Sequence, residues 1–116
     1  MANVIYCHCS QCRKTTGHYF ASTSCDRGDF KLTSDSGLDW YQSSPEAARG
    51  FCKRCGSTMF WDYKGSPTIS ILAGTLDAPT GLKAEVHIFV ADASDYYTID
   101  DGLPQHDHYG PVKAAE

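Results

Sequence analysis

Residues 7–12 read Cys7-His8-Cys9-Ser10-Gln11-Cys12, which places three cysteines within six positions. A second pair follows at Cys52 and Cys55, with Gly56 directly after it. Two cysteines separated by two residues on a turn can bind one tetrahedral zinc ion through both sulfurs, and a glycine supplies the positive φ that such turns often need. The sequence therefore predicts zinc, or another thiophilic metal, with these candidate ligands: Cys7, Cys9, Cys12, Cys52 and Cys55.

Two other uses of these cysteines are a redox Cys-x-x-Cys pair and a disulfide framework. Disulfides require an oxidising compartment, and residues 1–8 show neither the basic region nor the long apolar run of a secretory signal. Three cysteines in one short loop are also difficult to pair in disulfides, because the bonds would close loops of unfavourable geometry. We therefore expect metal-bound thiolates in a reducing cytoplasm. The sixth cysteine, Cys25, has no cysteine near it in the sequence and is expected to be a small buried apolar residue.

Length and composition predict one folded domain that covers residues 1–116. Apolar residues make up 41% of the chain, and no stretch approaches the roughly 20 apolar residues that a membrane span needs. The formal net charge of −4 counts against nucleic-acid binding, because such proteins usually carry a basic face. Basic residues nevertheless flank both cysteine loops, where they could form a solvated rim, attract a small anion or partly offset the negative charge of the thiolates: Arg13, Lys14, Arg49, Lys53 and Arg54.

Short runs of aromatic, β-branched and alternating residues, separated by turns rich in Gly, Pro, Asp and Ser, predict an all-β fold. We expect small antiparallel sheets around the zinc-binding cysteine loops, and these loops could lie side by side. The expected strands are 18–24, 30–33, 38–42, 57–63, 68–73, 85–91 and 96–99. Residues 46–52 are expected to be extended, and residues 100–116 are expected to be coil.

The histidines have ordinary structural interpretations beside functional ones. His8 is expected to point to solvent, because its cysteine neighbours take the directions toward the metal. The alternative is that His8 donates a hydrogen bond to a metal ligand or acts as a proton shuttle. His87 lies in an apolar strand and is expected to be a half-buried, hydrogen-bonded residue. His106 and His108 are expected to be a chance pair, and the Asp100-Asp101 pair to form a turn.

Three motifs resemble one known family. Residues 7–17, Cys-His-Cys-x-x-Cys-Arg-Lys-x-x-Gly, look like a signature of the glutathione-dependent formaldehyde-activating enzyme family, which also includes centromere protein V. Residues 49–57 resemble its Arg-x-Phe-Cys-x-x-Cys-Gly-[Ser/Thr] motif. His87-Ile88, followed by Asp101-Gly102-Leu103-Pro104, resembles its His-Ile…Asp-x-Leu-Pro ending. The resemblance extends over nearly the whole chain, with the motifs in the same order.

This resemblance implies an all-β fold shared with the Rab exchange factor called mammalian suppressor of Sec four. It also implies bound zinc and carbon–sulfur lyase chemistry, the reversible joining of glutathione to formaldehyde to give S-hydroxymethylglutathione. By the resemblance, Cys7, Cys9 and Cys12 form the reactive, catalytic zinc site. The same resemblance implies that Cys52 and Cys55 bind a structural zinc.

The chain departs from the family pattern at one point. Family members usually carry an upstream Gly-x-Cys-x-Cys-Gly strand that completes the structural zinc, and this chain lacks such a strand. Three explanations stay open: the sequence is truncated, Cys52 and Cys55 share a merged site with the first loop, or the pair binds no metal. A merged site with four or more thiolates would be closed and structural, with no open position for chemistry.

Two functions compete on this basis. Three protein thiolates would leave zinc one open position for a glutathione-like thiol, whose carboxylates could contact Arg13, Lys14 and Arg54. The alternative is a non-catalytic, zinc-stabilised module that binds another protein. An exposed patch formed by Trp40, Tyr41 and Trp61 would favour that alternative.

Overall fold

The computed structural model describes residues 1–109, and most of its regular structure is β-strand. The short helix α1 spans Ser10–Thr16, and 3₁₀ turns span Arg27–Asp29, Ala73–Thr75 and Val90–Asp92. Within residues 1–109 the strands are β1 Val4–Cys7, β2 Phe20–Asp26, β3 Leu38–Gln42, β4 Ala47–Cys52, β5 Thr58–Tyr63, β6 Thr68–Leu72 and β7 Ala84–Ile88. The prediction of an all-β fold is confirmed.

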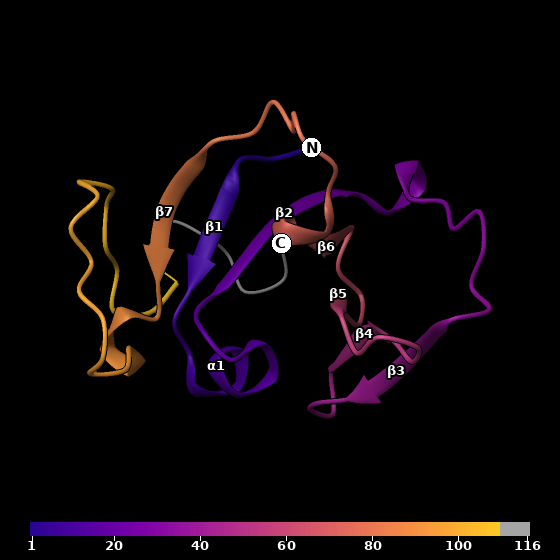
Figure 1. Cartoon of the computed structure of the whole chain (residues 1–116), viewed down its shortest axis with the longest axis horizontal. Coiled ribbons are helices and arrows are strands. Elements are labelled where there is room, and N and C mark those ends of the chain that lie inside the picture. The colour runs from indigo at the N-terminus through magenta and orange to yellow at the C-terminus, as the bar shows by residue number, and fades with distance from the viewer. Residues whose placement is uncertain (110–116) are drawn as a thin grey trace.

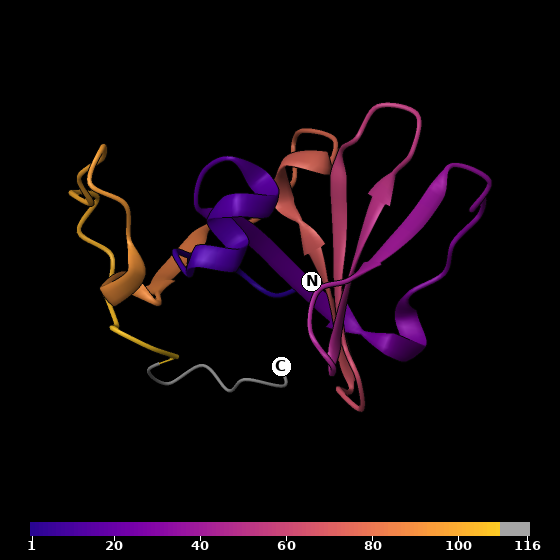
Figure 2. The same ribbon diagram turned by 90° about the horizontal axis from the view of Figure 1, so that it is seen from below.

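The seven strands form one sheet with the order β3-β4-β5-β6-β2-β1-β7 (Figure 1). All neighbouring strands are antiparallel except β1 and β7, which run parallel. Figure 2 shows β2 crossing from the β1–β7 side of the molecule to the β3–β6 side, with α1 beside it. In this register Cys7, at the end of β1, lies opposite Phe20 of β2 and Ile88 of β7.

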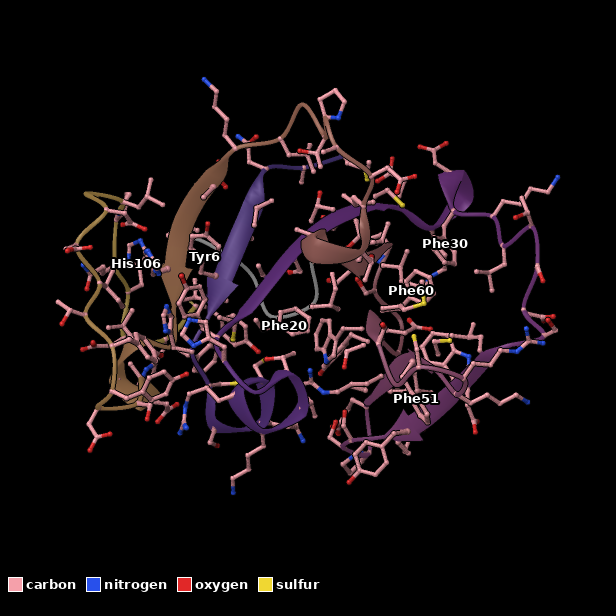
Figure 3. The ribbon with its side chains drawn as sticks, in the orientation of Figure 1. Tyr6, Phe20, Phe30, Phe51, Phe60 and His106 are labelled. Atoms are coloured by element: carbon pink, nitrogen blue, oxygen red, sulfur yellow. The ribbon has the colours of Figure 1, made fainter. Side chains whose placement is uncertain are left out.

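One buried cluster occupies the inner face of β1, β2 and β7. It consists of Cys7, Cys12, Phe20, Leu72, Val86 and Ile88. Figure 3 shows Phe20 pointing from β2 into the interior between the two sides of the sheet. Because side chains alternate along a strand, Ile5 and Cys7 face this cluster while Tyr6 packs against His87 on the opposite face. The end of β1 therefore separates a cysteine side from a histidine side.

The segment that follows β7 covers the free edge of that strand (Figure 1). The His87 N–H donates to Pro104 O at 2.9 Å, and the His106 N–H donates to His87 O at 3.0 Å. The Val90 N–H donates to His106 O at 3.0 Å. A segment without regular structure thus satisfies backbone groups that an open sheet edge would leave unpaired.

Three local predictions were wrong. Residues 30–33 form no strand: Phe30 packs edge-on against Phe60 at 5.1 Å between ring centroids, but Leu32 is 40% exposed, so the alternation buries only one side chain. Residues 96–99 form no strand either, and the Tyr96 and Tyr97 rings pack on each other at 4.8 Å. The strand expected over 85–91 ends at Ile88, because Phe89 takes a left-handed φ of 55°.

The coil expected over 100–116 is consistent with residues 100–109, which contain no helix or strand, and its remainder lies outside the described residues. Across residues 1–109, no helix has the length and apolar character needed to cross a membrane.

Candidate metal centre

Strand β1 and helix α1 bring Cys7, Cys9 and Cys12 together. Cys7 ends β1, Cys9 caps the N-terminus of α1, and Cys12 lies in the first turn of that helix. The Cys12 N–H donates to Cys9 Sγ at 3.3 Å, which fixes the side chain of the capping residue. Gly17 ends the helix in the left-handed conformation at φ 81°. All three sulfurs lie within 4.8 Å of one another.

This cluster suits a soft divalent ion. Zinc–sulfur bonds of about 2.3 Å in tetrahedral geometry place sulfurs about 3.8 Å apart, so small side-chain movements would close the cluster around zinc. The donors are three thiols, of which Cys7 and Cys12 are buried and Cys9 is half-buried. Three ligands from the protein would leave a fourth position for another molecule.

The protonation of the cluster also favours a cation. Hydrogen bonds from Cys12 and from Cys7 lower the pKa of Cys9 well below its ordinary value. The corresponding hydrogen bonds, together with burial, raise the pKa of Cys7. Binding of a metal would displace the thiol protons that remain in the cluster.

The sulfurs line a cavity of about 210 Å³ on the inner side of the sheet. Its polar wall consists of Gln11, Ser22, Arg49 and Ser70 in addition to the cysteines. Its apolar wall consists of Ile5, Phe20, Trp61, Ile88, Phe89 and Tyr109. A small molecule in this cavity would meet the cysteine sulfurs, one cationic side chain and mainly apolar surroundings.

Arg49 of β4 provides the positive charge beside the cluster. Its side chain is 3% exposed, and Nη2 donates to Cys12 Sγ at 3.6 Å and to Gln11 Oε1 at 3.3 Å. Nη1 donates to Thr15 Oγ1 at 3.3 Å, and the guanidinium lies 5.5 Å from the Phe20 ring centroid. Among residues 1–109, buried Arg49 Nε has no hydrogen-bond partner. The solvated rim expected as one alternative is wrong for Arg49, because the structure buries this side chain against a metal-ligand candidate. The contact is consistent with the other alternative, in which the basic residues partly offset the charge of the thiolates.

Cys52 and Cys55 lie apart from this cluster, in the turn between β4 and β5. Cys55 is exposed and its Sγ lies 3.1 Å from Ser57 Oγ, while Gly56 takes the positive φ of 79° that the motif suggested. The two loops are neighbours, since Thr58 Oγ1 donates to Thr15 O at 3.3 Å. Within residues 1–109, the group of cysteines that meets the geometry of a metal site contains Cys7, Cys9 and Cys12 and does not include Cys52 or Cys55.

The remaining cysteine and the C-terminal histidines stay outside the candidate site. Cys25 lies on β2 and is half-buried, less completely than expected. His106 and His108 join no metal-binding group among residues 1–109, and the His108 ring stacks on Phe89 at 6.0 Å.

His8 is fully buried, so the prediction that it points to solvent is wrong. β1 and the following residue alternate between the two faces of the sheet, and the histidine side is covered by the segment after β7. Burial, then the nearby His87, lowers the pKa of His8 to about 4. His87 is also buried and hydrogen-bonded, to His8 and to Asp101, a residue that was expected to lie in a turn and to belong to the Asp-x-Leu-Pro motif.

The exposed aromatic patch that would favour a protein-binding module is not formed by Trp40, Tyr41 and Trp61. Trp40 and Tyr41 are consecutive residues of β3, so their side chains point to opposite faces of the sheet. Trp61 lines the cavity beside the cysteine cluster.

The family model of the glutathione-dependent formaldehyde-activating enzymes matches residues 1–92. The chain belongs to this family. An uncharacterized lyase of Schizosaccharomyces pombe is 28% identical over 92 residues, which cover 78% of this chain and 66% of the yeast protein. The chain thus spans slightly less than two thirds of that relative. The formaldehyde-activating enzyme match includes both cysteine loops and Arg49, and it ends before Tyr97 and Asp101.

Proposed function

We propose that Cys7, Cys9 and Cys12 bind one zinc ion and that the chain is a carbon–sulfur lyase acting on a glutathione-like thiol and a small aldehyde such as formaldehyde. The observation that carries this proposal is the position of three mutually close sulfurs in the wall of a cavity that also contains a buried arginine. A reducing cytoplasm would keep these thiols available to a metal.

A zinc ion held by three thiolates would supply one open coordination position, where it could lower the pKa of an entering thiol or polarise a carbonyl. The cavity of about 210 Å³ is smaller than the about 300–1,000 Å³ typical of sites that enclose a drug-sized ligand. The proposal therefore places only the cysteine arm of glutathione inside. Its carboxylates would remain outside the cavity, and exposed Lys14, on the same helix as Gln11 of the cavity wall, is one candidate to contact them.

The residues of the chain have distinct tasks in the reaction. In the forward direction the sulfur lone pair forms a bond to the aldehyde carbon, the carbonyl π electrons move onto oxygen, and the thiol proton ends on that oxygen. Arg49 would stabilise the negative charge that develops on this oxygen, since its guanidinium lines the cavity beside Cys12. The apolar wall, which includes Phe20 and Trp61, would limit the access of water.

We also propose, from the family pattern, that Cys52 and Cys55 are the two ligands which this chain contributes to a structural zinc. The exposed position of Cys55 leaves room for ligands from elsewhere.

The test of the proposed reaction measures the exchange between glutathione and S-hydroxymethylglutathione by NMR at equilibrium with formaldehyde. We expect the zinc-loaded wild-type protein to accelerate the exchange and Cys9→Ser to abolish this acceleration. Cys25→Ser is the matched control, because it removes a thiol outside the cluster, and it should retain the wild-type rate. An exchange rate equal to that of the protein-free solution would refute the reaction, and equal rates for Cys9→Ser and wild type would refute the site.

A further inference from the structure

Four side chains form a continuous hydrogen-bonded chain on the face of β1 opposite the cysteines. Tyr97 Oη lies 2.6 Å from His8 Nδ1, and His8 Nε2 lies 2.8 Å from His87 Nδ1. His87 Nε2 lies 2.7 Å from Asp101 Oδ2. His8 is 0% exposed and His87 is 1% exposed, so water cannot readily replace these partners. We call these four residues the histidine network.

The donors and acceptors of the histidine network can be assigned from Asp101, the residue at its solvent-exposed end. Asp101 is a carboxylate with a 40% exposed side chain, and its other oxygen, Oδ1, accepts from the Leu103 N–H at 3.1 Å. An ionised carboxylate only accepts, so His87 carries its hydrogen on Nε2 and accepts on Nδ1. His8 must then carry its hydrogen on Nε2 and accept from the Tyr97 hydroxyl on Nδ1. Both imidazoles are fixed in the same Nε2–H tautomer.

His8 connects this network to the metal-ligand loop, because it is the residue between Cys7 and Cys9. Its backbone N–H donates to Ile88 O at 3.0 Å, and both ring nitrogens are engaged. Rotation of His8 would leave buried polar atoms without partners, which is costly in a buried environment. The backbone on either side of His8 is therefore held in the conformation that brings the flanking sulfurs together.

We propose that Asp101, His87 and Tyr97 are positioning residues that act through His8 to hold the Cys7-His8-Cys9 loop in its metal-binding conformation. The inference rests on the metal-binding part of the proposed function. It gives the segment after β7 a role in the site, although Tyr97 and Asp101 lie beyond the residues that the family model matches.

The first measurement is the tautomeric state, read from long-range ¹H–¹⁵N correlations of the imidazoles in the metal-free protein. We expect the Nε2–H pattern for both His8 and His87. An Nδ1–H pattern for either ring would overturn the network. This readout requires no metal, so it decides the hydrogen bonding even where zinc fails to bind.

The second measurement is zinc affinity by competition with a chromophoric chelator. Loss of outer-shell partners typically weakens metal binding by about 10–100-fold, so Asp101→Ala should raise the zinc dissociation constant by at least about tenfold. Asp101→Asn should rescue most of this loss, because the amide oxygen still accepts from His87 Nε2–H. Asp100→Ala is the matched control, since it removes an exposed carboxylate from the same segment.

Tyr97→Phe provides an independent variant that removes only the hydroxyl group and keeps the ring packed against Tyr19. It should weaken zinc binding in the same direction as Asp101→Ala. Wild-type affinity in both variants would overturn the positioning role. Absence of zinc binding in the wild-type protein would refute the proposed function and, with it, the positioning role, while the tautomer pattern would still report on the network itself.

Discussion

Replacement of Arg49 by methionine tests whether the buried charge beside the cysteines stabilises a metal–thiolate centre. Three thiolates and one zinc ion carry a net charge of −1, and the Arg49 guanidinium approaches Cys12 Sγ at 3.6 Å. With the two charges about 5 Å apart and an effective dielectric constant of about 20, Coulomb's law gives about 3 kcal/mol. That energy corresponds to about a hundredfold in the dissociation constant and is an upper bound for the variant.

Methionine keeps much of the length and apolar contact of arginine, so the fold should tolerate it. The substitution removes Arg49 Nε, which has no hydrogen-bond partner among residues 1–109. It also leaves Gln11 Oε1 without the Arg49 hydrogen bond, and because Gln11 is exposed, this oxygen can accept from water. Burial of a cation has a desolvation cost, and Arg49 forms no ion pair with a carboxylate among residues 1–109, so its replacement by an apolar side chain removes that cost. We expect the free energy of unfolding of metal-free Arg49→Met to stay within about 1–2 kcal/mol of the wild-type value, measured by urea denaturation.

The assay is chelator competition for zinc at fixed pH and about 0.15 M salt, where screening reduces the effect of exposed charges beyond about 8 Å. We expect Arg49→Met to raise the zinc dissociation constant by about tenfold to about a hundredfold. Lys14→Met is the matched control, because it removes an equal charge from an exposed position on α1. Equal affinities for Arg49→Met and Lys14→Met would refute the reasoning.

Three further substitutions test the structure around the site. Phe20→Ala removes a core ring that also supports Arg49; it should lower the free energy of unfolding by about 3–5 kcal/mol in urea denaturation, whereas Tyr41→Ala on the exposed strand β3 should have little effect. Gly17→Ala places a Cβ at φ 81° and should cost about 1–2 kcal/mol by the same assay, while Gly28→Ala, where φ is not positive and the space is open, should cost less. Burial lowers the pKa of His8 from 6.5 to about 4 in the folded protein. Between about pH 6.5 and pH 4 the unfolded chain therefore binds a proton on His8, whereas the folded chain does not. The free energy of unfolding of the metal-free protein should therefore fall as the pH drops from about 6.5 to about 4, and His8→Gln should show a weaker decline.

The cysteine spacing predicted the candidate site better than the elements around it. Thiols at positions 7, 9 and 12 are close in any compact turn, so their grouping follows from local sequence. The helix that holds them, α1, was missed because seven residues are too few to show a helical period.

The burial of His8 and of Arg49 could not be predicted, for a common physical reason. Whether each side chain is buried depends on segments far away in the sequence: the segment after β7 covers His8, and the packing of β4 against α1 encloses Arg49. The covering segment has no strand or helix pattern that local reasoning could detect. Asp101 was accordingly interpreted as a turn residue, and its partner His87 lies 14 positions earlier in the chain.

Strand predictions succeeded where the expected strand contains several buried residues, as in β6, whose residues Ile69 and Leu72 are buried on opposite faces. They failed at 30–33, where only the Phe30 ring found a packing partner. The order of the strands was not predictable from local patterns, because the parallel pairing of β1 with β7 joins residues near opposite ends of the chain.

The most direct test of the metal centre is zinc stoichiometry by native mass spectrometry, with the cysteine variants measured beside the wild-type protein. We expect the zinc ion of the proposed reactive centre to be lost in Cys9→Ser and retained in the double variant Cys52→Ser/Cys55→Ser. Retention of all bound zinc in Cys9→Ser, together with its complete loss in the double variant, would contradict the assignment of the reactive centre to Cys7, Cys9 and Cys12.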